Sequence, residues 1–229
     1  MCKNTYTLAR GPLLSTQWGQ SGVSNYFAPT SDCTCGHDPA GCGPVAMAQV
    51  IRYHQPNIGF EFSILPNVTS SGQCIANTPG EIALANLMTM CGIKASSKYH
   101  FFGCNTLTYP SDISGGLQGM GMSSGGSTTN YAPYILKNEI LAGYPVIFYA
   151  YDSIFNWHIW VCDGWEEHNY DTFNCDTGSC YEYGFSWFHM NYGWGQHQAN
   201  AWYASGVFTP NGTSNNYNSG LTMITGIRK

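Results

Sequence analysis

The sequence contains few charged residues, and few of these are basic. Asp, Glu, Lys and Arg make up 9% of the 229 residues, whereas an average globular protein contains about 25%. Lys and Arg together number eight, the formal net charge is −5, and no cluster of basic residues occurs. Binding to nucleic acid or to an anionic membrane depends on clustered positive charge, so neither is expected as a partner.

Long apolar runs are also absent. No stretch approaches the roughly 18 consecutive apolar residues of a membrane-spanning helix, and the first residues lack the apolar run of a signal peptide. Aromatic residues nevertheless reach 15%, and there are ten cysteines, a composition typical of extracellular proteins. The observations agree if an export signal has been removed, so we expect a secreted protein in its mature form.

The hydrophobic pattern predicts helices in the first part of the chain and strands in the second. The helices are expected over residues 42–54, 81–91 and 131–142, and the strands over 145–151, 157–163, 185–191, 201–207 and 221–227. Helices followed by an antiparallel sheet are typical of the α+β class. We therefore expect one domain over residues 1–229, with a helical half at about 1–143 and a sheet half at about 144–229.

Between the predicted helices, residues 102–129 are rich in Gly, Ser and Thr and are expected to form a loop. A loop of this length in a compact domain is usually functional or mobile. Residues 114–126 are therefore a candidate for a mobile flap over a binding cleft, although a plain surface loop fits the composition equally well.

One cysteine, Cys42, stands between two glycines at the beginning of the first predicted helix, where Pro44 suits the first turn. A thiol there lies at the positive end of the helix dipole and beside unpaired backbone N–H groups, which favour the nucleophilic thiolate. In a chain with ten cysteines, residue type alone favours a buried structural cysteine or half of a disulfide. A nucleophilic role therefore depends on finding a base.

Seven histidines compete for the role of that base. His54 lies at the other end of the same predicted helix, about 18 Å from Cys42 at a rise of 1.5 Å per residue. His158 begins a predicted strand among aromatic side chains that exclude water. Considered from this strand alone, a satisfied core histidine is a slightly better interpretation than a catalytic one.

Acyl transfer by a thiolate also needs a group that orients the histidine and a donor for the oxyanion. Asn191, at the end of the next predicted strand, could orient the imidazole. Gln20 could complete an oxyanion hole with the backbone N–H of Cys42. Taken singly, a turn asparagine and a surface glutamine are the better interpretations of these two residues.

Taken in order, the motifs resemble the streptopain family of papain-like cysteine peptidases. Leu-Leu-x-x-x-Trp-x-Gln ends at Gln20, and Gly-Cys precedes a helix that ends in Tyr-His. His-x-Trp-Val-x-Asp-Gly begins at His158, and His-x-Asn-aromatic-Gly-Trp-Gly begins at His189. The resemblance extends from Leu13 to about Tyr203. It implies a two-part papain-like fold, with a cleft between the helix of the nucleophile and the sheet of the histidine.

The resemblance also implies a role for each candidate in the hydrolysis of peptide bonds through a thioester. Cys42 would be the nucleophile, His158 the general base and later the acid, Gln20 the oxyanion donor and Asn191 the orienting group. The expected substrate-binding residues are Tyr192, Gly193 and Trp194. No metal or cofactor is implied. A thiolate and an imidazolium stabilise one another, so the pair is expected to be mostly charged at neutral pH.

The expected partners are protein or peptide substrates, and the chain is expected to be a monomer. Members of the family are made with a propeptide, and nothing before Leu13 is long enough to be one, so the chain resembles the mature catalytic domain. A propeptide or a protein inhibitor is a further candidate partner. Two alternatives remain: another Cys–His acyl-transfer enzyme, such as an amidase or transpeptidase, or an inert secreted binding module. Trp157 stands directly before His158, where the family has a small residue, and this keeps the second alternative open.

The remaining cysteines form two sequence clusters. Cys175 and Cys180 flank an expected hairpin tip that a disulfide could close. Cys33, Cys35 and His37 follow a metal-like spacing, but no second pair of ligands accompanies them. Disulfides or free thiols are therefore favoured over zinc at this cluster.

Overall fold

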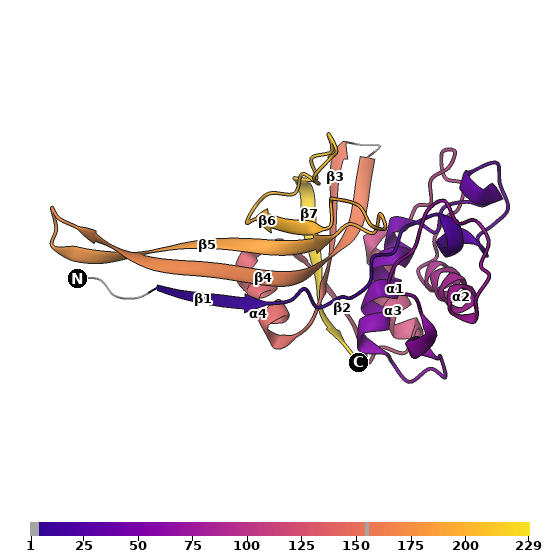
Figure 1. Ribbon diagram of the computed structural model, residues 1–229, viewed down its shortest axis with the longest axis horizontal. Coiled ribbons are helices and arrows are strands. Elements are labelled where there is room, and N and C mark those ends of the chain that lie inside the picture. The colour runs from indigo at the N-terminus through magenta and orange to yellow at the C-terminus, as the bar shows by residue number, and fades with distance from the viewer. Residues whose placement is uncertain (1–4, 154–155) are drawn as a thin grey trace.

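A twisted antiparallel sheet and a group of helices lie side by side in the computed structural model, which describes residues 5–153 and 156–229 (Figure 1). The helices are α1 (Cys42–His54), α2 (Pro79–Lys94), α3 (Pro110–Gly119) and α4 (Pro133–Ala142). The strands are β1 (Thr5–Arg10), β2 (Ser124–Asn130), β3 (Val146–Ser153), β4 (Asn156–Asn174), β5 (Ser179–Asn191), β6 (Ala201–Ala204) and β7 (Ser219–Arg228). None of the helices in these ranges is both long and apolar enough to cross a membrane.

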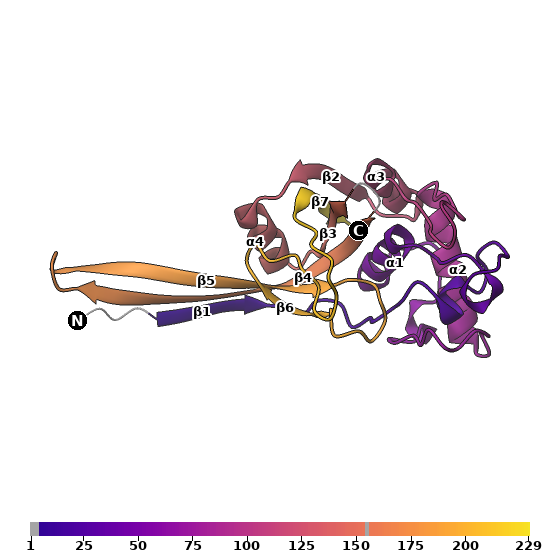
Figure 2. The same ribbon diagram turned by 90° about the horizontal axis from the view of Figure 1, so that it is seen from above.

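Helix α1 lies between the sheet and α2 in both views (Figures 1 and 2). Its residues from Cys42 to Ile51 are all buried, because the helix packs on the sheet on one side and on the other helices on the other. Val45 and Ile51 share one core with Ile159 and Val161 of β4. The sequence therefore builds α1 as a central element, and its first residue is held against the beginning of β4.

The strands follow the order β2-β7-β3-β4-β5-β6, and β1 pairs with β4. Side chains alternate between the two faces of the sheet: Ile147 and Ile159 face α1. Phe148 and Trp160 point the other way, into a second core that α4 joins through Leu136. The α+β class and the two cores agree with the expected two-part architecture. The division at residue 143 is less strict than expected, because β1 and β2 come from the first part of the chain.

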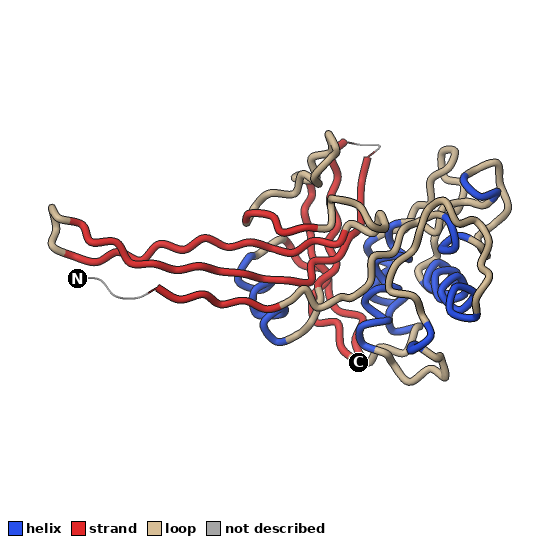
Figure 3. Tube along the Cα trace, in the orientation of Figure 1, coloured by secondary structure: helices blue, strands red, loops and turns tan. Residues whose placement is uncertain are grey.

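The longest strands extend well beyond the body of the molecule (Figure 3). β4 has 19 residues and β5 has 13, whereas the sequence pattern predicted only 157–163 and 185–191. β1 lies along β4, with Thr5 opposite Tyr170. We call the projecting part, residues 5–10, 165–174 and 179–187, the arm. The alternation of aromatic with polar or small residues from Tyr181 to Trp187 was a signal for the longer strand that the prediction did not use.

The predicted loop at residues 102–129 contains both α3 and β2. Gly and Ser are weak helix formers, but Ile113 and Leu117 are fully buried, so packing stabilises α3. Gly125 of β2 lies directly against α3, and a Cβ there would come within 1.8 Å of the Ser114 carbonyl oxygen. The prediction of a mobile flap over residues 114–126 is therefore wrong.

Two disulfides crosslink the helical half, Cys33–Cys104 and Cys35–Cys74. Cys33 lies close to Asp38 and His100, but it offers no free thiolate to a metal because it is oxidised. The expectation that a disulfide between Cys175 and Cys180 closes the hairpin tip is wrong. Cys175 is free and exposed, and Cys180 is engaged in a disulfide elsewhere.

The packing of β2 on α3 gives a test of the fold. Replacing Gly125 by Ala should lower the free energy of unfolding by about 1–3 kcal/mol, because the new methyl group has no room beside the backbone of α3. Gly115→Ala is the matched control: a Cβ at residue 115 meets nothing within 4 Å, and Ala is the better helix former. Urea denaturation measures both variants. Equal stability of the two would contradict the packing described.

Candidate active site

A cleft of about 550 Å³ opens between the beginning of α1 and the beginning of β4. Four of the predicted site residues line it together: Gln20, Cys42, His158 and Trp194. Aromatic side chains supply much of the remaining wall, namely Phe101, Phe102, Trp157 and Tyr217. The sequence pattern placed the first four residues here and missed most of the wall, because its members come from loops far apart in the chain.

Cys42 is the first residue of α1, and its side chain is buried. The preceding residue, Gly41, has φ +95°, a conformation that L side chains rarely adopt. A Cβ on Gly41 would also come within 2.8 Å of the Thr106 side chain. Burial raises the pKa of the Cys42 thiol, and the opposing hydrogen bonds, including those from the backbone of Ile159 and Gly43, do not cancel this effect.

His158 is buried at the beginning of β4, and its Nε2 lies 2.7 Å from the carbonyl oxygen of Tyr192. A carbonyl oxygen only accepts, so Nε2 carries the proton and donates. In the neutral ring, Nδ1 is therefore unprotonated and can act as a base. Trp194 and Tyr217 lie against the ring at centroid distances of 4.9 and 5.5 Å. Burial lowers the pKa of His158 to about 4, although the Tyr192 carbonyl opposes this shift.

These pKa shifts run opposite to the expected charge state of the pair. With the pKa of Cys42 raised by burial and that of His158 lowered to about 4, both side chains are neutral at pH 7. The unliganded site therefore holds a thiol and an imidazole rather than the mostly charged pair expected from the sequence. The dipole of α1 does favour a thiolate at Cys42, but the desolvation caused by burial has the larger effect on the pKa of the thiol.

Asn191 is buried, and its hydrogen bonds lead away from His158. Its Nδ2 donates to the Thr16 carbonyl oxygen at 2.7 Å and to Gln49 Oε1 at 2.9 Å. Its Oδ1 accepts from Gln49 Nε2 at 3.3 Å and from the Gly193 N–H at 3.1 Å. The geometry assigns the orientation of His158 to the Tyr192 carbonyl instead of the Asn191 amide. Asn191 joins the end of β5 to α1.

Gln49 joins α1 to the end of β5 below the cleft, and the sequence pattern did not predict this role. It is 1% exposed within the apolar run of α1, and a buried polar side chain needs partners. Besides bonding to Asn191, it accepts a hydrogen bond at 3.0 Å from Thr16 Oγ1. A single glutamine among Val45, Ala48 and Ile51 was the available signal. It predicts a buried contact, but not the identity of the partner.

Two of the three predicted substrate-binding residues do not line the cleft. The Tyr192 side chain is fully buried in the second core, so it cannot contact a substrate, and only its carbonyl serves the site. Gly193 is also buried, with φ +69°, and a Cβ there would come within 2.9 Å of Val45 Cγ1. Trp194 alone lies on the cleft.

Backbone hydrogen bonds hold the Gln20 segment beside the loop that precedes Cys42. The Ala40 N–H donates to the Gln20 carbonyl oxygen at 2.8 Å, which ties this segment to the loop before Cys42. The Gly195 N–H donates to the Trp18 carbonyl oxygen at 3.1 Å, which brings the segment of Trp194 to the same place. The uncharged amide of Gln20 therefore lies on the cleft as a candidate donor to an oxyanion.

The opposite wall is fixed by a crosslink that the sequence did not reveal. Phe101, Cys104 and Thr106 line the cleft, and the Cys33–Cys104 disulfide attaches their loop to the segment before α1. The Thr106 hydroxyl also donates to the Pro39 carbonyl oxygen at 2.6 Å. The wall is thus held by one covalent and one hydrogen-bonded contact.

The charge state of the pair predicts how Cys42 reacts with iodoacetamide. The thiolate is the reactive form, and burial raises its pKa, so the alkylation rate should climb about tenfold per pH unit between pH 6 and pH 8. Peptide mapping of the Cys175→Ala variant, which lacks the exposed free thiol, measures this rate. A rate that is already constant from pH 5 upward would mean that the pair is charged.

Asn191 should act on stability more than on chemistry. Asn191→Ala leaves the Thr16 carbonyl, the Gln49 amide and the Gly193 N–H without their partner, and a lost buried hydrogen bond costs about 1–3 kcal/mol. Chemical denaturation measures this loss, with the exposed Asn57→Ala as control. The pH profile of turnover should stay unchanged. A variant of normal stability with a hundredfold lower kcat would return Asn191 to the orienting role.

Residues 59–203 match the model of the peptidase C10 family. The fold is similar to that of the active wild-type interpain A cysteine protease from Prevotella intermedia, with a TM-score of 0.71, 20% identity and coverage of 96% of each chain. It is also similar to a fragment of prointerpain A from the same organism, with a TM-score of 0.64 and 20% identity over 96% of this chain and 73% of that one. A search among curated proteins found no match. The likeness to interpain A bears out the papain-like fold, and the family match carries the identification: the chain belongs to the peptidase C10 family, the streptopain family that its motifs resemble, and is a cysteine-type peptidase.

Proposed function

We propose that the chain is a secreted cysteine endopeptidase that cleaves peptide bonds with Cys42 as nucleophile and His158 as general base. The observation that carries this proposal is that both side chains line one cleft, Cys42 from α1 and His158 from β4. His158 is held through Nε2, which leaves Nδ1 as the atom that takes the thiol proton. Membership of the peptidase C10 family supports the same chemistry.

In the first step, Cys42 Sγ attacks the carbonyl carbon of the scissile peptide bond while its proton moves to His158 Nδ1. The carbonyl oxygen becomes an oxyanion that accepts hydrogen bonds from the Cys42 N–H and the Gln20 side-chain amide. The imidazolium then gives its proton to the leaving nitrogen, the C–N bond breaks, and a thioester remains. A water that loses a proton to the neutral imidazole attacks this thioester. The C–S bond breaks, the acid product leaves, and the imidazolium returns its proton to the Cys42 thiolate.

A neutral resting pair fits this sequence because the charges form only when the substrate is in place. The developing negative charge on sulfur and oxygen favours the imidazolium beside it. The Tyr192 carbonyl continues to accept from Nε2–H in the charged ring. Trp194 and Tyr217 shield the ring from water, which strengthens each of these interactions.

The proposed substrates are protein or peptide chains, bound against the aromatic wall of the cleft without a metal or cofactor. Two disulfides in the helical half support secretion, because such bonds persist in oxidising environments. The likeness to a prointerpain fragment supports a propeptide, or an inhibitor of similar shape, as a partner of the cleft. We propose that the mature enzyme acts as a monomer.

Labelling with an epoxide inactivator of cysteine peptidases tests the proposal. Peptide mapping should find the label on Cys42, with a matching loss of casein cleavage under mild reduction. Cys42→Ala should abolish both labelling and cleavage with little change in Tm, because a methyl group fits the buried site. Cys175→Ala, which removes an exposed free thiol, should keep full activity.

The other outcomes discriminate between the alternatives. Labelling of Cys42 without cleavage of casein or peptides would indicate a narrower acyl-transfer enzyme, such as an amidase or transpeptidase. An unlabelled Cys42 would overturn the mechanism and favour an inert binding module.

A further inference from the structure

Trp157 is a large residue at the catalytic cleft that the proposed chemistry does not use. It comes directly before His158 in β4, at a position where a small residue is expected. Its indole ring is partly buried and lines the cleft. An aromatic side chain that borders the catalytic pair without taking part in the reaction is a candidate determinant of which substrates enter.

A second cavity, of about 270 Å³, adjoins the catalytic cleft. Among the described residues, only Phe101 and Trp157 line both spaces. The centroids of their rings are 6.4 Å apart, and the ring planes are inclined by 59°, which is the geometry of an aromatic pair in contact. The two rings therefore separate the second cavity from the catalytic cleft, and we call this pair the partition.

The partition connects the two walls of the cleft. Phe101 belongs to the loop that follows α2 on the helical side, and Trp157 belongs to β4 of the sheet. A strand inside a sheet lies about 4.7 Å from its neighbour on each side, so an extended chain cannot pass between two rings that already touch. A substrate that lies along the cleft must stop at the partition, pass over it or push the rings apart.

The loop that carries Phe101 is held firmly. The Phe101 N–H donates to the Asn105 carbonyl oxygen at 2.7 Å, and Asn105 Nδ2 donates to the Phe102 carbonyl oxygen at 3.0 Å. His100 and Phe102, on either side of Phe101, have φ values of +55° and +52°, which are uncommon for residues other than glycine. His100 Nδ1 also lies 2.9 Å from Oδ1 of the buried Asp38. The backbone and its contacts thus fix the position from which the Phe101 ring projects.

Trp157 is held by the sheet. It lies opposite Tyr151 of β3 in the antiparallel register. Alternate residues of a strand share one face, so Trp157 projects on the same side as Ile159, which packs in the core with α1. The ring is therefore directed toward the helical half, and the partition is closed in the unliganded structure.

We propose that Phe101 and Trp157 determine the length of the substrate, so that the enzyme hydrolyses short peptides faster than long polypeptide chains. This inference rests on the proposed peptidase function and narrows its substrate class. A short peptide fits within the catalytic cleft of about 550 Å³ on one side of the partition. A long chain must displace the rings, and loss of one aromatic contact corresponds to about a tenfold change in an equilibrium constant.

Intact casein and its tryptic digest test the proposal, because they contain the same sequences in chains of different length. The initial rate of formation of new amino groups is measured for each at equal concentrations of peptide bonds, after removal of trypsin. The parent protein should cleave the digest faster. Trp157→Ala and Phe101→Ala should each raise the rate on intact casein relative to the digest about tenfold. The double variant should equal the single variants, because removal of either ring opens the partition.

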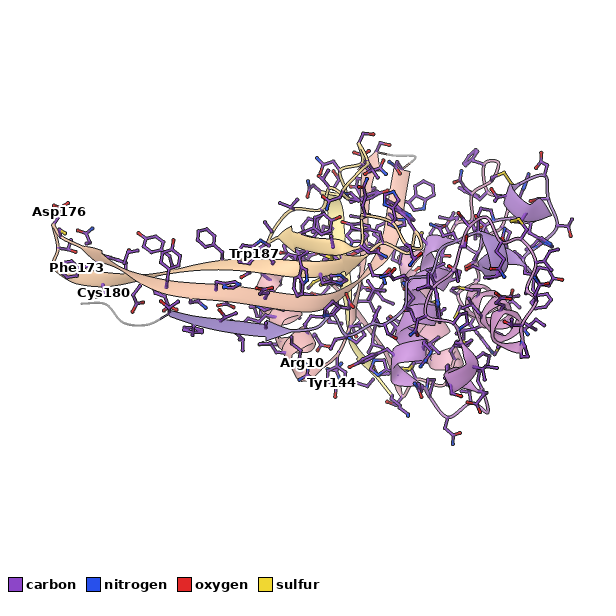
Figure 4. All side chains as sticks on the ribbon, in the orientation of Figure 1. Arg10, Tyr144, Phe173, Asp176, Cys180 and Trp187 are labelled. Atoms are coloured by element: carbon purple, nitrogen blue, oxygen red, sulfur yellow. A yellow bond between two sulfur atoms is a disulfide. The ribbon has the colours of Figure 1, made fainter. Side chains whose placement is uncertain are left out.

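Two control variants locate the effect. Phe173→Ala removes an exposed ring at the free end of the arm, where Figure 4 labels this residue. Tyr109→Ala enlarges the second cavity and leaves both rings of the partition in place. Both controls should keep the ratio of rates that the parent shows.

Binding to the Cys42→Ala protein gives a second readout that does not depend on turnover. Fluorescence anisotropy of fluorescein-labelled casein should show about tenfold tighter binding when either ring of the partition is also replaced by Ala. The Tyr109→Ala and Phe173→Ala substitutions in the same background should leave the Kd unchanged.

Three results would overturn the proposal. The first is a ratio of rates that is the same in the parent and in both single ring variants. The second is casein binding that is unchanged or weaker after the rings are replaced. The third is a double variant in which the two single effects multiply, because the rings would then act separately. Absence of hydrolysis by every protein, together with tighter casein binding by the ring variants, would contradict the mechanism at Cys42 and support the partition.

Discussion

The buried hydrogen bonds between Gln49 and Asn191 are the constraint on which the site depends. Gln49 lies on the helix that begins with Cys42, and Asn191 ends the strand that leads to the carbonyl holding His158. Thr16 bonds to both amides, so the segment that carries Gln20 is fixed to the same point. Amide side chains suit this junction, because they donate and accept without burying a charge. The segment of Gln20, helix α1 and the end of β5 are therefore all fixed to this one buried junction.

Burial at this junction also determines the electrostatics of the cleft. A helix N-terminus beside a thiol ordinarily lowers the pKa of the thiol, yet here burial raises the pKa of Cys42 and lowers that of His158 to about 4. With these shifts, both side chains are neutral at pH 7 in the unliganded cleft. Trp194 and Tyr217 pack against the His158 ring and exclude water from it, and the Tyr192 carbonyl accepts the hydrogen bond from its Nε2. The same packing of β4 against residues 192–194 thus both excludes water from His158 and positions the Tyr192 carbonyl that accepts its hydrogen bond.

Local chemistry explains how much could be predicted from the sequence. The glycines around Cys42, the helical spacing after it and the strand beginning at His158 are short-range patterns, and the structure places both residues on one cleft. The Tyr192 carbonyl was not predictable, because a backbone acceptor carries no residue signature. Asn191 has the residue type of an orienting group, but its neighbour in space, Gln49, lies 142 residues away. The helix α3 was missed because burial of Ile113 and Leu117 overrides the weak propensities of its Gly and Ser residues.

The arm follows from a different balance of forces. Within the body, β4 is covered on both faces, by α1 and by the second core, and its apolar residues form a continuous run. Beyond Trp165 the strands persist because β1, β4 and β5 pair with one another and aromatic rings stack across them. Proteins usually protect such edges with Lys, Pro or bulges. The stretch from Ser179 to Phe185 contains neither Lys nor Pro. The length of the arm therefore depends on strand pairing and on ring stacking between Tyr170, Tyr183 and Phe185, and not on a covered core.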